Sequence, residues 1–227
     1  MSRPWWAPPA AALLFRAVWP VRVHGAQHVP GSGPVILASN HTAFLDGPML
    51  VAVAPRWTTC LVKSEAFHGV LGAVLRSAGQ IPVERHTGDR AALAAALRVL
   101  ESSGALGMFP EGTRGRGDVA AVQQGVAWLA LRSGAPVVPV ACLGVRRTGE
   151  RTGSLPPPRR RLDVVFGPPV TVTAPDGVPG RTALVHATTT VRDALAEHVA
   201  RAVELTGTTL PADLGWSAEQ VARGEHL

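Results

Sequence analysis

The sequence predicts a single α/β domain in which a mostly parallel central sheet is flanked by helices. Three short runs without charged residues, at 34–38, 105–109 and 137–141, are typical of strands buried on both faces. Segments with apolar residues at helical spacing lie between them, and this alternation favours βαβ units. A chain of 227 residues is long enough for one sizeable domain and short for two.

Residues 1–24 are expected to form an N-terminal segment at a membrane interface. The segment is apolar and rich in tryptophan, but Arg16 interrupts it and Pro20 closes it, so it is shorter than the roughly 20 apolar residues that span a bilayer. An apolar interfacial helix fits, because tryptophan suits the headgroup boundary and Arg3 and Arg16 can meet anionic lipid. A helix packed on the protein's own core is the alternative, and both can hold at once.

The domain itself is expected over residues 25–205. Asp89 reads as the N-cap of one helix, and Gly79, Gly104 and Gly134 read as helix ends. Residues 162–166 and 170–172 read as edge strands, and residues 206–227 as a loosely held tail. The expected helices cover residues 48–54, 66–77, 90–102, 119–132 and 181–205.

Two polar motifs directly follow two of the apolar runs. The segment 40–46 reads Asn-His-x4-Asp, and the segment 109–114 reads Phe-Pro-Glu-Gly-Thr-Arg. In open α/β sheets, ligands collect outside the carboxyl ends of the strands, where loops can present polar groups. The sequence therefore predicts that a histidine, a carboxylate and an arginine meet at one edge of the sheet.

The spacing between His41 and Asp46 requires a turn. Five residues along a helix rotate by about 500°, so the two side chains would point roughly 140° apart on a regular helix. A strand that ends near Ser39 and a helix that begins near Asp46 would instead fold the carboxylate back onto the imidazole. This contact would fix one tautomer and leave the other ring nitrogen as a base, with an ordinary pKa of about 6.5. Since the chain has no Gly-x-Ser-x-Gly elbow, this base would activate a substrate hydroxyl directly.

Four blocks in this order resemble the glycerophospholipid acyltransferase family. They are residues 40–46, residues 79–85, which end in an acidic residue and an arginine, residues 109–114, and Val-Pro-Val at 138–140. The resemblance implies that His41 is the general base and that Asp46 orients it. It also implies an acyl-acceptor site in which Lys63 leads into the site, Arg85 is a second phosphate ligand, and the glycerol phosphate is bound by Glu111, Gly112, Thr113 and Arg114.

The resemblance implies an O-acyltransferase at the cytoplasmic face of the cell membrane. The expected reaction moves a fatty acyl group from acyl-CoA or acyl carrier protein to the hydroxyl of 1-acylglycerol-3-phosphate and gives phosphatidate. No metal or other cofactor is expected, because the thioester is already activated. The alternatives are a different lyso-lipid or alcohol acceptor, or a non-catalytic basic lipid-binding module of the same fold.

The charge balance favours an anionic partner. Charged residues make up only 17% of the chain, yet the formal net charge is +6. A basic surface suits membranes, nucleotide phosphates or nucleic acid, but nucleic acid is not expected because the arginines are not interleaved with aromatic residues. Six arginines cluster around a loop rich in glycine and proline. We expect them to form a mobile basic flap that binds lipid headgroups or the phosphates of coenzyme A, or else a solvated loop. They are Arg146, Arg147, Arg151, Arg159, Arg160 and Arg161.

The cysteines and the remaining histidines predict no metal centre. Cys60 and Cys142 are far apart and have no second pair near them, so neither a zinc site nor a disulfide framework is implied. Cys142 reads as a buried strand thiol. The other histidines show no metal-ligand spacing and are interpreted as surface residues.

Overall fold

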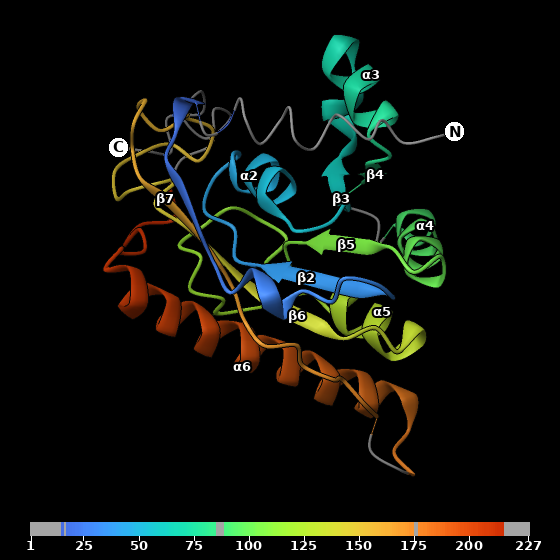
Figure 1. The fold of residues 1–227 in the computed structure, drawn as a ribbon. Coiled ribbons are helices and arrows are strands. Elements are labelled where there is room, and N and C mark those ends of the chain that lie inside the picture. The colour runs from blue at the N-terminus through green and yellow to red at the C-terminus, as the bar shows by residue number, and fades with distance from the viewer. Residues whose placement is uncertain (1–14, 16, 85–88, 175–176, 216–227) are drawn as a thin grey trace.

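The computed structural model describes residues 15, 17–84, 89–174 and 177–215. Within these residues, seven strands form one sheet in the order β1-β7-β6-β2-β5-β3-β4 (Figure 1). Strands β2 to β6 are parallel to one another, β7 is antiparallel to β6, and β1 is parallel to β7. The predicted α/β domain with a mostly parallel sheet is therefore confirmed. The strands are β1 Val21–His24, β2 Val35–Ser39, β3 Thr58–Lys63, β4 Ile81–Val83, β5 Ala105–Met108, β6 Val137–Leu143 and β7 Leu162–Phe166.

Helices cover both faces of the sheet, which explains why its central strands carry no charge. Val35 and Leu37 of β2 pack in the cluster that includes α2, whereas Ile36 and Ala38 pack in the cluster with α4, α5 and α6. Alternate residues of a strand point to opposite faces, so a strand covered on both sides must be apolar throughout. Figure 1 shows α2 above the sheet and α5 and α6 below it. The helices are α2 Asp46–Val53, α3 Gly69–Ser77, α4 Arg90–Glu101, α5 Gly125–Ser133 and α6 Gly180–Thr206, with the short 3₁₀ helices η1 Ala26–His28 and η2 Ser64–Phe67.

The helix predictions are most accurate where a capping residue marks the start of the helix. Asp89 accepts a hydrogen bond from the Ala92 N–H (2.9 Å), so α4 begins where the sequence predicted. The start predicted for α5 is wrong by six residues, because the Gln123 N–H donates to the Pro110 carbonyl (2.7 Å) and holds the preceding segment as a loop. The helix predicted over residues 66–77 is divided into η2 and α3 by an extended residue at His68.

The prediction that residues 162–166 form an edge strand is wrong. Strand β7 lies between β6 and β1, and all five of its residues are buried. Strand β1, which the sequence did not reveal, covers its outer side, so residues 21–24 belong to the sheet. Val170 makes only an isolated bridge to Val137, and residues 170–172 form no strand.

The described ends of the chain pack on the domain. Phe15 is buried in the core, and the Trp19 indole N–H donates to the Pro156 carbonyl (3.0 Å). Near the other end, the Ala212 N–H donates to the Thr148 hydroxyl (3.0 Å), so this part of the expected tail contacts the domain. Residues 1–14, 16 and 216–227 lie outside the described residues, and with them most of the expected interfacial helix. No helix in the described part of the chain combines the length and apolar character needed to cross a bilayer.

Candidate active site

The side chains of His41 and Asp46 meet in the predicted turn. Strand β2 ends at Ser39, α2 begins at Asp46, and the His41 Nδ1 lies 3.1 Å from the Asp46 Oδ2. The same carboxylate oxygen accepts the backbone N–H groups of Thr42 (2.6 Å) and Ala43 (2.8 Å). The Thr42 hydroxyl donates to this oxygen as well (3.4 Å). Four donors therefore converge on one oxygen of a fully buried carboxylate, and this convergence fixes the shape of the loop.

Asn40 anchors the start of this loop to the neighbouring strand. Its side-chain Oδ1 accepts the Cys142 N–H (2.7 Å), and its Nδ2 donates to the Cys142 carbonyl (3.3 Å). The amide thus continues the ladder between β2 and β6 by one further pair after the backbone of β2 has turned away. His41 therefore leaves the sheet from a fixed point.

The imidazole of His41 is oriented on a second side by an aromatic ring. Only 6% of His41 is exposed, and its ring centroid lies 4.3 Å from that of Phe109, with 32° between the ring planes. With Asp46 ionised, Nδ1 carries the proton that it donates to the carboxylate, so Nε2 is the basic nitrogen of the neutral ring. A histidine held in one tautomer beside a buried carboxylate is suited to general-base catalysis.

The loop after β5 contacts the backbone of His41 from both sides. The His41 N–H donates to the Glu111 Oε1 (2.8 Å), and the Gly115 N–H donates to the His41 carbonyl (3.0 Å). Strands β2 and β5 are parallel neighbours, so their carboxyl ends bring the two motifs together as predicted. Gly112 has φ of 72°, a left-handed conformation that a side chain would strain.

Glu111 is a weaker acid in this position than an ordinary glutamate. Burial, followed by the nearby Asp118 and Asp46 carboxylates, raises its pKa to about 7, although the hydrogen bond from His41 acts in the opposite direction. The resemblance assigned Glu111 to substrate binding. In the structure, one of its carboxylate oxygens accepts the backbone N–H of the histidine.

The free energy of unfolding should therefore depend on pH through Glu111. Between the ordinary carboxyl pKa of 4.5 and about 7, the folded protein retains a proton that the unfolded chain releases, so stability falls as pH rises. Glu111→Gln removes this titration and keeps a carbonyl oxygen for the His41 N–H. Urea denaturation between about pH 5 and 7 should show a flatter pH dependence for Glu111→Gln than for the wild type. Glu101→Gln, at an exposed site on α4, is the matched control, and a wild-type slope in Glu111→Gln would contradict the assignment.

The other predicted site residues occupy different surroundings. Arg114 is half-buried, and its guanidinium carbon lies 5.5 Å from the centroid of the Phe44 ring, whereas Thr113 is exposed. Lys63 lies at the carboxyl end of β3 and pairs with Glu65 (2.8 Å) at the surface, as is usual for such neighbours. Arg85 lies outside the described residues.

Sequence reasoning missed the role of Arg146, which it placed in a mobile flap. The side chain is only 1% exposed, its Nε donates to the Thr42 carbonyl (3.1 Å), and its Nη2 donates to the Gly115 carbonyl (2.9 Å). Its guanidinium also pairs with the Asp213 carboxylate. Arg146 thus joins the histidine loop, the loop after β5 and the C-terminal segment. An arginine in a basic cluster gives no local sign of burial, so the sequence carried no signal for this role.

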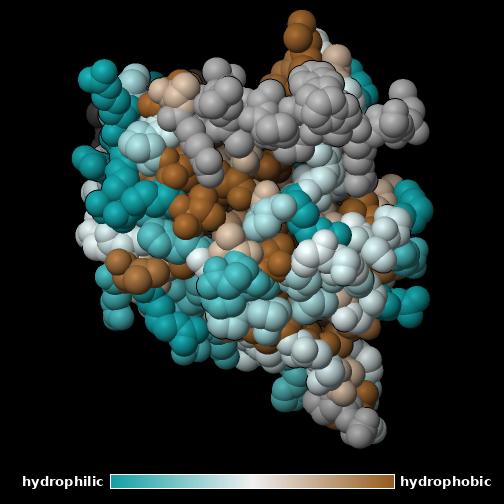
Figure 2. Space-filling view, in the orientation of Figure 1, coloured by the Kyte–Doolittle hydropathy of each residue, from teal (hydrophilic) through white to brown (hydrophobic). Residues whose placement is uncertain are grey.

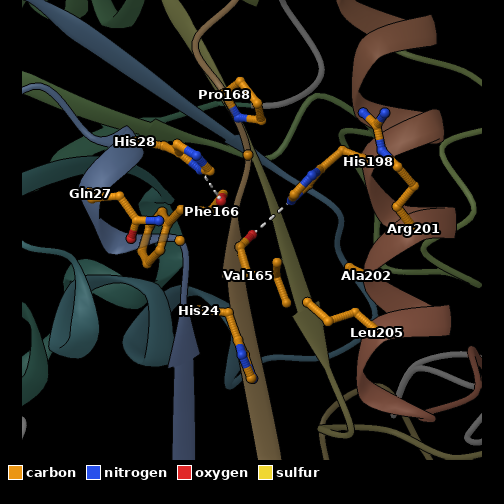
Figure 3. A pocket seen from close by; sticks show the side chains of 12 residues that line it. His24, Gln27, His28, Val165, Phe166, Pro168, His198, Arg201, Ala202 and Leu205 are labelled. Atoms are coloured by element: carbon orange, nitrogen blue, oxygen red, sulfur yellow. Dashed lines mark hydrogen bonds between the residues drawn. The ribbon is translucent and has the colours of Figure 1, made fainter.

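Three histidines interpreted as surface residues instead line a pocket of about 280 Å³ between β1, β7 and α6 (Figure 3). His198 is 5% exposed, and its Nε2 bonds to the Val165 carbonyl (2.9 Å). His28 bonds through Nδ1 to the Phe166 carbonyl (2.9 Å), and His24 contacts Asp163 (3.1 Å). The three rings thus connect β1, η1 and α6 to β7. Among the described residues, no group of three or more His, Cys, Asp or Glu side chains is placed to hold a metal ion.

Both cysteines are buried thiols in strands. Cys142 lies in β6, as the sequence predicted, and Cys60 lies in β3. Burial raises the pKa of the Cys60 thiol to about 12, so it stays protonated and unreactive near neutral pH.

Comparison with known proteins identifies relatives of this arrangement. The 1-acyl-sn-glycerol-3-phosphate acyltransferase of Bacillus subtilis is 27% identical over 126 residues, which are 55% of this chain and 63% of that protein. The human 1-acyl-sn-glycerol-3-phosphate acyltransferase alpha is 33% identical over 125 residues, 53% of this chain and 44% of that protein. The match thus spans less than two thirds of the length of either relative.

The fold has a counterpart among solved structures. The crystal structure of the 1-acyl-sn-glycerophosphate acyltransferase PlsC from Thermotoga maritima superposes with a TM-score of 0.63 and covers 88% of this chain and 76% of that one, at 21% identity. The family model described as Acyltransferase matches residues 20–143, which include β2, β5 and both loops that meet at His41. This match extends over more than half of the sequence, and the chain therefore belongs to the acyltransferase family.

Proposed function

We propose that this protein is an O-acyltransferase that transfers a fatty acyl group from acyl-CoA or acyl carrier protein to the hydroxyl of 1-acylglycerol-3-phosphate, giving phosphatidate. The observation that carries the proposal is the buried pair of His41 and Asp46, held at the sheet edge by the loop that bears Arg114. The names of the relatives support this acceptor.

In the proposed reaction, the His41 Nε2 accepts the proton of the acceptor hydroxyl while that oxygen attacks the thioester carbonyl. The tetrahedral intermediate then expels the thiolate, which takes the proton back from the imidazolium. Asp46 stabilises the imidazolium between the two steps, because its carboxylate lies 3.1 Å from Nδ1. A positioned general base of this kind typically contributes about 10²–10⁴ in rate.

We assign the acceptor's phosphate to Arg114, which Gly112 and Thr113 directly precede in the chain. The family resemblance adds Arg85 as a second phosphate ligand. Planar guanidinium groups bind phosphate through two parallel charge-assisted hydrogen bonds. Phe44 lies against Arg114 and is 40% exposed, so the ring can orient the guanidinium toward a bound lipid. Glu111 supports the same loop through the His41 N–H.

We further propose that the enzyme binds peripherally to the cytoplasmic face of the membrane, and that α3 contributes to this contact. Val70, Leu71 and Val74 of α3 are 84%, 50% and 55% exposed, and the helix contains no acidic residue. Figure 2 shows the apolar surface of this helix where it projects from the body of the protein. Large aliphatic side chains exposed together on one helix suit the boundary of a bilayer.

Replacing all three aliphatic residues of α3 by serine should weaken binding to phospholipid vesicles by about tenfold or more. Each substitution removes apolar surface that would be transferred from water into the bilayer on binding. Sedimentation with vesicles of mixed phosphatidylglycerol and phosphatidylethanolamine measures the effect. The matched control replaces the exposed Val185 and Leu205 of α6 by serine. Equal binding by the α3 variant and the wild type would contradict a role for this helix.

The reaction is tested with purified protein, radiolabelled acyl-CoA and a panel of acceptors that includes 1-acylglycerol-3-phosphate, lysophosphatidylcholine and glycerol 3-phosphate. Labelled phosphatidate is the expected product. Transfer to another acceptor in preference would contradict the assigned substrate. No transfer to any acceptor, from acyl-CoA or from acyl carrier protein, would favour a lipid-binding module without turnover.

A further inference from the structure

The structure divides the arginine cluster into internal and accessible members. Arg146 is buried, and the side chain of Arg160 is 7% exposed with both nitrogens on the Glu150 carboxylate. Arg147 and Arg161, in contrast, line a cleft of about 480 Å³ together with Gly144, Gly207, Thr208 and Thr209. Only this second pair is placed to meet a ligand through the cleft.

The cleft has an excess of positive charge. Within the described residues, the exposed side chain of Arg147 makes no hydrogen bond or ion pair, and the nearby Glu150 carboxylate is already paired with Arg160. Arg161 donates to the Thr206 carbonyl (2.9 Å) and lies 3.4 Å from the Asp163 carboxylate.

Asp163 does not neutralise Arg161 fully. The same carboxylate also pairs with Arg22 at 2.8 Å, so one negative charge serves two guanidinium groups. The Thr206 carbonyl at the end of α6 would repel an anion, but Arg161 already donates to it. The chemistry of the cleft therefore suits an anion with several oxygen acceptors, such as a phosphate.

The cleft opens at the same edge of the sheet as His41. Gly144 directly follows β6, Arg161 directly precedes the antiparallel β7, and Leu143 pairs with Asp163. Asn40, next to His41, binds the main chain of Cys142 on β6. With strands about 5 Å apart and a rise of about 3.3 Å per residue, Gly144 lies within roughly 12 Å of Asn40.

We propose that Arg147 and Arg161 bind the nucleotide phosphates of the acyl donor, a coenzyme A thioester. This inference rests on the proposed function, because it names the donor of that reaction. In such a donor, the flexible pantetheine arm separates the thioester from the phosphates. The cleft and His41 lie at the same edge of the sheet, with Gly144 roughly 12 Å from Asn40 by the strand register. We therefore infer that the flexible arm lets an acyl-CoA place its phosphates at the two arginines while its thioester reaches His41. Thr208 and Thr209 also line the cleft, and a threonine hydroxyl can donate a hydrogen bond to a phosphate oxygen.

The test compares two donors in the Arg147→Gln variant. The KM for acyl-CoA should rise about tenfold with kcat unchanged, because a charged hydrogen-bonding group is lost from the phosphate site only. The KM for S-acyl-pantetheine, which has no phosphate, should stay at the wild-type value. Arg151→Gln is the matched control, because it removes the same charge from an exposed position in the same loop that does not line the cleft.

Equal changes with both donors, or none with acyl-CoA, would overturn the proposal. So would a variant that loses affinity for anionic vesicles but keeps its KM for acyl-CoA, since the cleft would then recognise lipid headgroups. Calorimetric titration with free coenzyme A separates this inference from the proposed function. If the wild type binds coenzyme A about tenfold more tightly than Arg147→Gln but transfers no acyl group, the phosphate site is supported and the proposed acyltransferase function is contradicted. If transfer occurs and both proteins bind coenzyme A equally, the proposed acyltransferase function is supported and the phosphate site is contradicted.

Discussion

Replacing His41 by alanine is expected to lower kcat for acyl transfer by about 10²–10⁴-fold, the usual contribution of a positioned general base. The expectation follows from a ring that is almost fully buried, fixed through Nδ1 by Asp46 and packed against Phe109. Initial rates with radiolabelled acyl-CoA and 1-acylglycerol-3-phosphate measure the change. The KM for either substrate should change little, because the proton is transferred only as the reaction proceeds.

The fold should survive this substitution. Asp46 retains the N–H groups of Thr42 and Ala43, so its buried carboxylate keeps two of its hydrogen bonds when the imidazole is removed. Thermal unfolding followed by circular dichroism checks this point, and His186→Ala on the exposed face of α6 is the matched control. A folded His41→Ala protein with kcat within a few-fold of the wild type would refute the base assignment.

The centre of the site could be predicted from the sequence because its geometry is local. The turn between His41 and Asp46 is closed by hydrogen bonds within six consecutive residues. The approach of Glu111 requires only that two parallel strands be neighbours, which two uncharged runs followed by polar motifs already indicate. The start of α4 follows from a single N-cap aspartate for the same reason.

The features that escaped prediction depend on partners distant in the chain. Strand β7 is interior because β1, 141 residues earlier, covers its outer side, and neither segment shows this in its own pattern. The loop before α5 avoids helix because Gln123 is bonded to Pro110. His198 can be buried because its ring N–H donates a hydrogen bond to the Val165 carbonyl. In each case a long-range contact overrides the local preference.

Arg146→Lys is expected to lower both the free energy of unfolding and kcat. The guanidinium uses all three of its nitrogens, because Nε and Nη2 reach the carbonyls of Thr42 and Gly115 while Nη1 reaches the Glu150 carbonyl (3.2 Å) and the Asp213 carboxylate. A lysine has one donor atom and cannot reach these acceptors together. It keeps the buried charge but leaves several of these groups unsatisfied, so we expect a loss of about 3 kcal/mol in urea denaturation.

The loss of kcat should exceed the loss that lower stability explains. Arg146 holds both the loop that carries His41 and the loop after β5 that contacts it. Misplacement of a catalytic group by about 1 Å can cost on the order of 10²-fold, so we expect kcat to fall by about 10–100-fold at temperatures where the variant is folded. Arg160→Lys is the matched control, because Arg160 is a neighbouring buried arginine whose bonds go to Glu150 and Val145 and to neither loop. It should lose stability and retain kcat. Equal losses of kcat in the two variants would show that Arg146 only stabilises the fold, whereas a loss confined to Arg146→Lys would show that the arginine positions the base.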